Sequence, residues 1–216
     1  MSSDNLPPQM NIGENPITIV GPVGQIEGIL TLPADYKADD VMVICHPHPL
    51  EKGTMHNKVV HTLAKTFSSL GMPCFRFNFR GVGKSEGGHD HAIGEREDLK
   101  AVVAYALEMF PKANLRLAGF SFGSAISAAV ANELGAISLT SIAPPVVRWG
   151  FEDIDMPVCD WLIVQGEADE VIDAEDVFDF AQSQVIQPKV IRFEDTSHFF
   201  HGKLVQLKDA LLEYYG

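Results

Sequence analysis

The residue whose type and setting most directly suggest chemistry is Ser121, at the centre of the pentapeptide 119–123 (GFSFG). Residues 115–118 before it are typical of a short buried strand, and the small, alanine-rich residues 124–134 after it favour a helix. A sharp turn from a strand into a helix presents a serine hydroxyl as an exposed nucleophile. The flanking glycines leave room for that turn because they have no Cβ. The N-terminus of the helix would stabilise negative charge beside the hydroxyl.

A nucleophilic serine needs a base, and the base needs an acid that orients it. Asp169 follows the expected strand 161–164, and His198 follows the expected strand 190–193. Ser121, Asp169 and His198 therefore form a candidate catalytic triad, each just past a strand. Each residue alone also fits an ordinary turn or packing role. Other candidates are nearby in the sequence: Glu167, Glu170 and Asp173 for the acid, and His201 for the base.

Stabilising the oxyanion of acyl transfer requires two N–H donors. The backbone N–H of Phe122 is expected to be one, and the loop after the expected strand 41–45 should supply the other. Proline has no N–H, which leaves His48 as the better candidate and Leu50 as the second. His46 and His48 also form an H-x-H pattern that can bind zinc. No set of cysteines or carboxylates completes such a site, so no metal is expected.

Strands and helices alternate along the chain. Apolar runs predict eight strands, at residues 17–20, 25–32, 41–45, 74–79, 115–118, 137–142, 161–164 and 190–193. Helical spacing predicts helices at residues 56–70, 94–110, 122–134, 174–184 and 204–214. The first two strands read as an antiparallel hairpin. The remaining alternation predicts an α/β fold with a mostly parallel sheet and helices on both faces.

The composition is that of one soluble domain. The 216 residues are 46% hydrophobic and 21% charged, and no apolar run is long enough to span a bilayer. We expect a flexible N-terminal segment at residues 1–15 and a single domain at 16–216. The net charge of −13 argues against a nucleic-acid or anionic-membrane partner. The three well-separated cysteines are expected to be free thiols, which favours a cytoplasmic location.

Several segments make the chain similar to the α/β-hydrolase superfamily over about residues 17–215. They are residues 45–50 (CHPHPL), 54–60 (TMHNKVV), 78–87 (NFRGVGKSEG), 119–123 and 197–200 (SHFF). The likeness is greatest to small bacterial serine hydrolases of the dienelactone-hydrolase-like and esterase-like branch. One departure is that His46 and Pro47 stand where the family usually has His-Gly.

The resemblance implies a serine hydrolase that cleaves a carboxylic ester or thioester with a small acyl group, without a cofactor. Only residues 143–160 separate the sixth and seventh strands, too few for a helical cap, so a capless member is expected. Trp149 and Phe199 are the expected substrate-binding side chains. Two alternatives remain open: a peptidase or amidase with the same triad, and a non-catalytic binding protein on the same fold.

Overall fold

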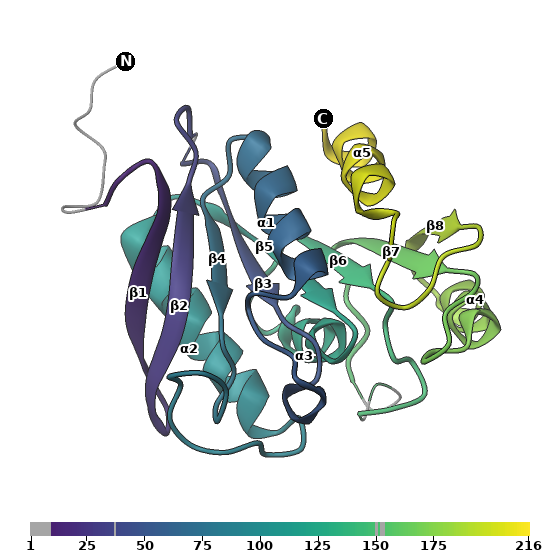
Figure 1. Ribbon diagram of the computed structural model, residues 1–216, viewed down its shortest axis with the longest axis horizontal. Coiled ribbons are helices and arrows are strands. Elements are labelled where there is room, and N and C mark those ends of the chain that lie inside the picture. Colours follow the sequence, from purple (N-terminus) through teal and green to yellow (C-terminus); the bar gives the residue numbers. More distant parts are fainter. Residues whose placement is uncertain (1–9, 37, 150, 152–153) are drawn as a thin grey trace.

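The structure is a computed structural model that describes residues 10–36, 38–149, 151 and 154–216. Its centre is one eight-stranded sheet in the order β1-β2-β4-β3-β5-β6-β7-β8 (Figure 1). The strands are β1 (Gly13–Gly21), β2 (Gly24–Leu32), β3 (Asp40–Cys45), β4 (Cys74–Phe77), β5 (Asn114–Phe120), β6 (Ser138–Ile142), β7 (Asp160–Gly166) and β8 (Lys189–Phe193).

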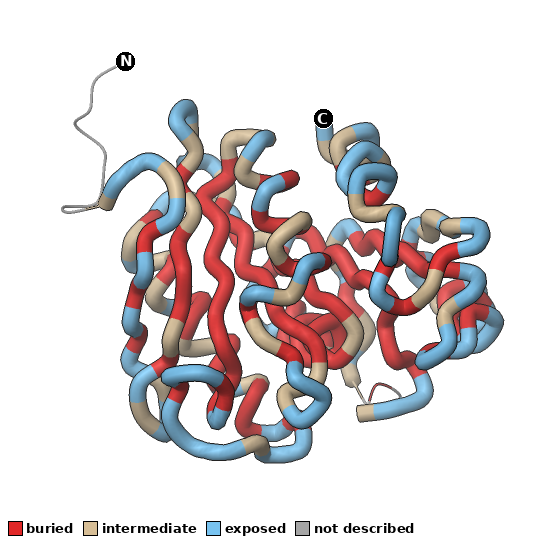
Figure 2. The backbone as a smooth tube through the Cα atoms, viewed as in Figure 1, coloured by how far each residue is buried: buried red, intermediate tan, exposed pale blue. Residues whose placement is uncertain are grey.

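Only β2 runs against its neighbours in this sheet. It pairs antiparallel with both β1 and β4, whereas β4, β3, β5, β6, β7 and β8 pair parallel. Strands β3 to β7 are almost continuously buried, as the tube view shows (Figure 2), whereas the edge strand β8 is not. Because these strands are parallel, their carboxyl ends meet at one edge of the sheet, where loops from distant parts of the sequence lie together.

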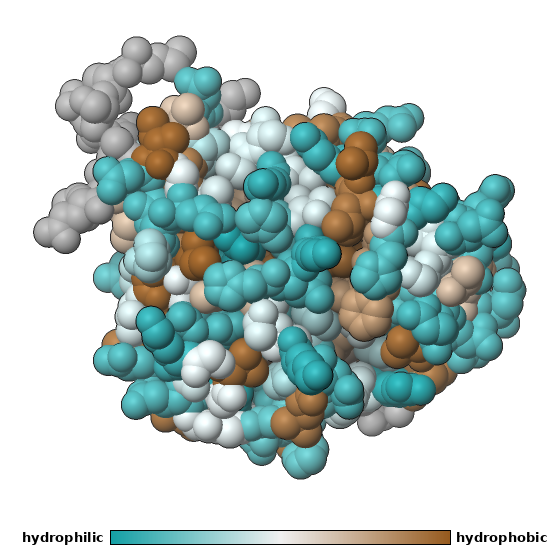
Figure 3. Space-filling model, in the orientation of Figure 1, coloured by the Kyte–Doolittle hydropathy of each residue, from teal (hydrophilic) through white to brown (hydrophobic). Residues whose placement is uncertain are grey.

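Helices cover both faces of the sheet. Apolar residues of α1 (Lys58–Ser69) and α5 (Leu204–Tyr215) pack on one face, and those of α2 (Gly94–Met109), α3 (Phe122–Val130) and α4 (Ala174–Ser183) pack on the other. This arrangement confirms the predicted single-domain α/β fold. Hydrophilic residues dominate the view of Figure 3, with apolar side chains in small separate patches. No helix in the described part of the chain is long and apolar enough to cross a membrane.

The N-terminal boundary differs from the sequence expectation. Strand β1 begins at Gly13, so residues 13–15 belong to the sheet and not to a flexible segment; residues 1–9 lie outside the described part. The reason is local polar bonding. The buried Asn15 amide donates to the carbonyl oxygens of Asn11, at 2.7 Å, and Gly13, at 3.0 Å. Glu14 also pairs with the buried Arg76 guanidinium at 2.6 Å.

Two helix ends differ from those that apolar spacing predicts. Helix α1 begins two residues later than expected because the Asn57 side chain accepts a hydrogen bond from the Val59 N–H, at 2.8 Å. Helix α3 ends at Val130, four residues before the predicted end.

All three cysteines are free; Cys45 and Cys74 are buried and Cys159 is half-buried.

Candidate active site

Ser121 lies at a strained turn between β5 and α3. Its φ of 52° and ψ of −122° are rare for a residue with a side chain. The turn is held by the Ser121 N–H, which donates to the Ile142 carbonyl at 2.8 Å. A Cβ at Gly119 would overlap the Gly123 backbone, and one at Gly123 would approach the Cys45 carbonyl oxygen within 2.5 Å. Both glycines of the pentapeptide are therefore required by close backbone packing.

The structure brings His198 and Asp169 together, although 29 residues separate them. His198 Nδ1 lies 2.8 Å from Asp169 Oδ2, and both side chains are almost fully buried. The second carboxylate oxygen, Oδ1, accepts hydrogen bonds from the backbone N–H groups of Val171 and Ile172, each at 2.8 Å. Oδ2 also accepts a bond from Gln165 Nε2 at 3.1 Å. With four donors on its two oxygens, the carboxylate is fixed in position and the imidazole is aligned on it.

The pKa of Asp169 lies below its ordinary value. Burial raises this pKa, but the hydrogen bonds from His198 and from the Ile172 and Val171 N–H groups outweigh burial. When the Asp169 carboxylate accepts a hydrogen bond from Nδ1–H of His198, the other ring nitrogen, Nε2, is free to take up a proton. The pair thus has the electrostatics of an acid that orients a base.

The loops after β7 and β8 are joined by backbone contacts that bring this pair together. The Glu167 N–H donates to the Phe193 carbonyl at 2.9 Å, and the Ala168 N–H donates to the Thr196 carbonyl at 3.1 Å. Gly166 permits this approach, because a Cβ there would overlap the Thr196 carbonyl oxygen. The neighbouring loop residue Glu170 accepts a bond from the His198 N–H at 3.1 Å.

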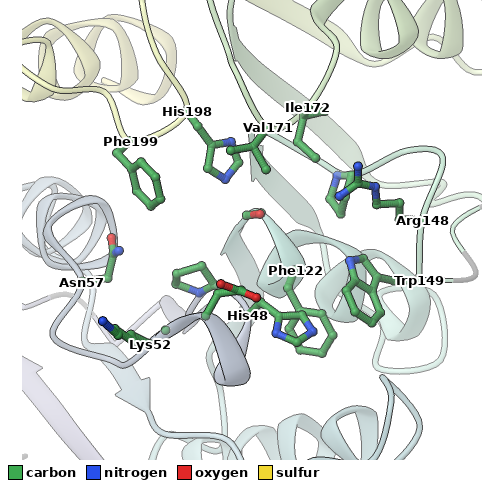
Figure 4. A pocket seen from close by; sticks show the side chains of 15 residues that line it. His48, Lys52, Asn57, Phe122, Arg148, Trp149, Val171, Ile172, His198 and Phe199 are labelled. Atoms are coloured by element: carbon green, nitrogen blue, oxygen red, sulfur yellow. The ribbon is translucent and has the colours of Figure 1, made fainter.

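Ser121 and His198 line the same cavity, of about 460 Å³, at the carboxyl edge of the sheet. His198 points into it from one side, and His48 and Phe122 form the opposite wall (Figure 4). Phe122 is the first residue of α3, so its N–H has no partner within the helix. This places a serine hydroxyl, an imidazole and an N–H of the helix N-terminus around one space.

The loop after β3 is held by two histidines. The fully buried His46 accepts a bond from the Phe79 N–H at Nε2, 3.0 Å away, and its Nδ1 lies 2.6 Å from the Pro47 carbonyl oxygen. His48 Nδ1 accepts from the Leu50 N–H at 3.2 Å and caps the short turn η2 (Pro49–Glu51). The Leu50 N–H is therefore already engaged, and its side chain is 68% exposed. This arrangement favours His48 over Leu50 as the second oxyanion donor.

Known proteins share this architecture. A family model described as the alpha/beta hydrolase fold matches residues 40–156. The chain belongs to the α/β-hydrolase family. An uncharacterized protein of Rickettsia prowazekii is 34% identical over 206 residues, which span 90% of this chain and 85% of that protein.

Two solved structures resemble this α/β-hydrolase along nearly their whole length. XC6422 from Xanthomonas campestris, a serine hydrolase without lid, is 42% identical with a TM-score of 0.90, covering 96% of this chain and 95% of its own. An alpha-beta serine hydrolase homologue from Coxiella burnetii is 44% identical with a TM-score of 0.92, covering 96% of this chain and 100% of its own. These likenesses support a hydrolase.

In the described part of this α/β-hydrolase, no helical cap covers the cavity. The connection from β6 to β7 spans residues 143–159, and its described residues include no α-helix. Instead, aromatic rings form the wall beside Ser121: the Trp149 ring centroid lies 4.5 Å from that of His48 and 5.3 Å from that of Phe122. Phe199 lines the cavity at the other side and is 42% exposed (Figure 4).

His48 and His89, two histidines of this wall, contact each other and a buried carboxylate. Burial, and then the positive charge of nearby His89, lower the pKa of His48. His89 lies against His48, with ring centroids 4.9 Å apart, and its Nδ1 is 2.8 Å from the fully buried Glu95 carboxylate. Among the described residues, no group of three histidine, cysteine or acidic side chains is placed to hold a metal ion.

Two contributors to this site were not identified from the sequence. His46 bridges the ends of β3 and β4, and Gln165 bonds to Asp169. The signal for Gln165 was present: it continues an alternating row of β7 whose earlier members, Trp161 and Ile163, are buried and apolar. A polar residue in such a row needs an explanation.

Proposed function

We propose that the protein is a serine hydrolase that cleaves a carboxylic ester or thioester with a small acyl group. The observation that supports this most directly is the shared cavity of Ser121 and His198, with His198 bonded to Asp169 at 2.8 Å behind it. A serine on a strained elbow, an aligned imidazole and a buried carboxylate together form the apparatus of acyl transfer. The similarity to a serine hydrolase without lid at 42% identity supports the same reaction class.

In the proposed reaction, Ser121 Oγ attacks the substrate carbonyl carbon while His198 Nε2 takes its proton. Asp169 holds the imidazole through Nδ1 and stabilises the imidazolium that forms. The N–H groups of Phe122 and His48 bind the oxyanion. His198 then gives the proton to the departing alcohol or thiol, which leaves an ester on Ser121. Water, deprotonated by His198, releases the acid and restores the serine.

The open cavity favours small acyl groups. It holds about 460 Å³, and the described residues of the β6–β7 connection supply no helix to cover a long chain. Burying each CH₂ contributes about 0.8 kcal/mol, so the gain from lengthening an acyl chain ends where the cavity ends. We expect a preference for acyl groups of about C2 to C6, with Trp149 and Phe199 in contact with the substrate.

The alternatives use the same architecture. A peptidase or amidase would need the same three side chains, and only the leaving group would differ. A non-catalytic binding protein would need none of them, so the four hydrogen bonds on the Asp169 carboxylate favour catalysis. Relative rates on matched p-nitrophenyl esters, thioesters and anilides separate the first two classes.

A fluorophosphonate probe tests the proposal directly. The wild-type protein should react at Ser121, and the adduct should be found by mass spectrometry of the peptide that contains residue 121. Ser121→Ala should abolish labelling and lower ester hydrolysis by several orders of magnitude, because only binding and the oxyanion donors remain. The matched control is Ser183→Ala, at an exposed serine of α4. Full hydrolysis by Ser121→Ala, with intact circular dichroism, would refute the assignment.

A further inference from the structure

The residue just before the last position of β7 is a fully buried glutamine. Gln165 is 0% exposed and continues the alternating row of Trp161 and Ile163, which pack in the apolar layer between the sheet and helices α2, α3 and α4. An apolar side chain is the ordinary choice for such a position, because burying an amide requires hydrogen bonds to replace those with water. The contacts of Gln165 therefore indicate why a polar residue is present.

The amide nitrogen makes two hydrogen bonds, and the amide oxygen makes none. Gln165 Nε2 donates to the Asp169 carboxylate Oδ2 at 3.1 Å and to the Gly166 carbonyl at 3.0 Å. Both partners are acceptors, so the NH₂ group must face them and the orientation of the amide is determined. Gln165 Oε1 is buried and accepts no bond from any described residue. The side chain thus leaves a buried acceptor unpaired while its donor reaches Asp169.

The oxygen that Gln165 contacts is the one that His198 uses. Asp169 Oδ2 accepts from His198 Nδ1 at 2.8 Å and from Gln165 Nε2 at 3.1 Å. We propose that Gln165 is a positioning residue, whose amide holds Asp169 Oδ2 in the direction of His198 and shares that oxygen's negative charge. This inference rests on the proposed function, because it assigns Gln165 a role in aligning the same triad.

Sharing the oxygen has a chemical consequence. A carboxylate oxygen that already accepts a bond from Gln165 is a weaker acceptor for His198. Removing the amide should hold Asp169 Oδ2 less firmly, although the Val171 and Ile172 N–H groups still bind Oδ1. It should also strengthen the attraction between the carboxylate charge and the imidazolium. The first effect lowers kcat. The second raises the pH at which His198 becomes neutral and able to act as a base.

The other charged groups around the pair stay constant in this comparison. Glu170 accepts a bond from the His198 N–H, and Arg148, Glu51 and Lys52 line the cavity from the loops after β6 and β3. The rings of Phe120 and Phe199 lie 5.0 and 5.1 Å from that of His198. A change at residue 165 alters none of these side chains, so a shift in the pH profile can be assigned to Gln165.

The test is Gln165→Met, which keeps the length of the side chain and removes both the donor and the unpaired oxygen. We expect kcat for p-nitrophenyl acetate to fall by about tenfold and the acid limb of kcat/KM to move up by as much as about one pH unit. The melting temperature should stay the same or rise, because a buried unpaired acceptor is gone. Gln165→Glu, which replaces the donor with a second negative charge beside Oδ2, should move the acid limb further in the same direction.

The matched control is Gln184→Met, at a glutamine of similar bonding whose Nε2 donates to the Phe180 carbonyl at 3.0 Å, next to helix α4. It should leave kcat and the pH profile unchanged. If Gln165→Met keeps the wild-type kcat and acid limb, or loses melting temperature in proportion to activity, Gln165 is a structural residue and the inference is wrong.

Failure of the proposed function gives a different result. In that case the wild-type protein neither hydrolyses esters nor reacts with the fluorophosphonate probe. The inference is then tested by the NMR titration of the His198 ring in wild type and in Gln165→Met. An upward shift of its titration midpoint in Gln165→Met supports the contact, and identical curves overturn it.

Discussion

The buried imidazole of His46 makes a quantitative prediction about stability and pH. Its Nε2 accepts from the Phe79 N–H at 3.0 Å, so the ring is neutral and its proton is on Nδ1, facing the Pro47 carbonyl oxygen at 2.6 Å. Burial lowers the pKa of His46 from 6.5 to about 4; the Pro47 carbonyl opposes this and His48 adds to it. Protonating Nε2 in the folded state would also remove the acceptor of the Phe79 N–H.

The sign follows from the order of the two pKa values. Between pH 6.5 and about 4 the unfolded chain binds a proton at residue 46 and the folded chain does not. The stabilising effect is complete above pH 6.5 and is lost as the pH falls toward 4. Each pH unit in this interval is worth about 1.4 kcal/mol, so the folded state loses about 3 kcal/mol through this one residue.

The assay is urea unfolding of the wild-type protein and of His46→Gln at pH 7, 5.5 and 4.5. Glutamine can also donate and accept but does not titrate, so the difference in unfolding free energy between the two proteins should narrow steadily as the pH falls. His61→Gln is the control, because the His61 side chain is 39% exposed whereas His46 is fully buried. A difference between wild type and His46→Gln that stays constant over this range would refute the reasoning.

Three further results are expected. Asp169→Asn should lower kcat by roughly three to four orders of magnitude by leaving His198 without its charged partner, whereas Glu170→Gln, which still accepts the His198 N–H, should lower it less than about tenfold; the opposite ranking would identify Glu170 as the triad acid. Gly123→Ala should lower the melting temperature and the soluble yield, because its Cβ would come within 2.5 Å of the Cys45 carbonyl oxygen; an unchanged melting curve would contradict this packing. Values of kcat/KM for p-nitrophenyl esters should peak between about C2 and C6, and a steady rise to palmitate would indicate a long acyl groove.

Much of this architecture follows from local patterns. Buried strands such as β3 and β5 are continuous apolar runs, and in parallel sheets the residues just after such runs meet at one edge. That rule alone predicts that Ser121, Asp169 and His198 approach each other. The need for glycine at positions 119 and 123 is also predictable, because a strained elbow leaves no room for a Cβ at either position.

Other features depend on polar contacts that the apolar pattern of the sequence does not indicate. Asn15 stabilises the start of β1 by hydrogen bonds to the carbonyl oxygens of Asn11 and Gly13, which no apolar pattern indicates. The Leu50 N–H donates to the His48 ring, a contact that the sequence does not indicate. The positioning role proposed for Gln165 depends on where the Asp169 carboxylate lies in space. In each case a polar side chain has several possible partners, and only the coordinates decide which contact forms.

The strand order has a consequence for how the protein folds. Strand β3 pairs with β5 although α1, β4 and α2 lie between them in the sequence, and β5 to β8 are joined only by parallel crossovers. Such pairings close long loops before they yield contacts, and they therefore form slowly compared with helices. A refolding chain should recover its helical signal while Ser121, Asp169 and His198 are still apart. The return of catalytic competence then reports completion of the sheet, not the earlier collapse of the chain.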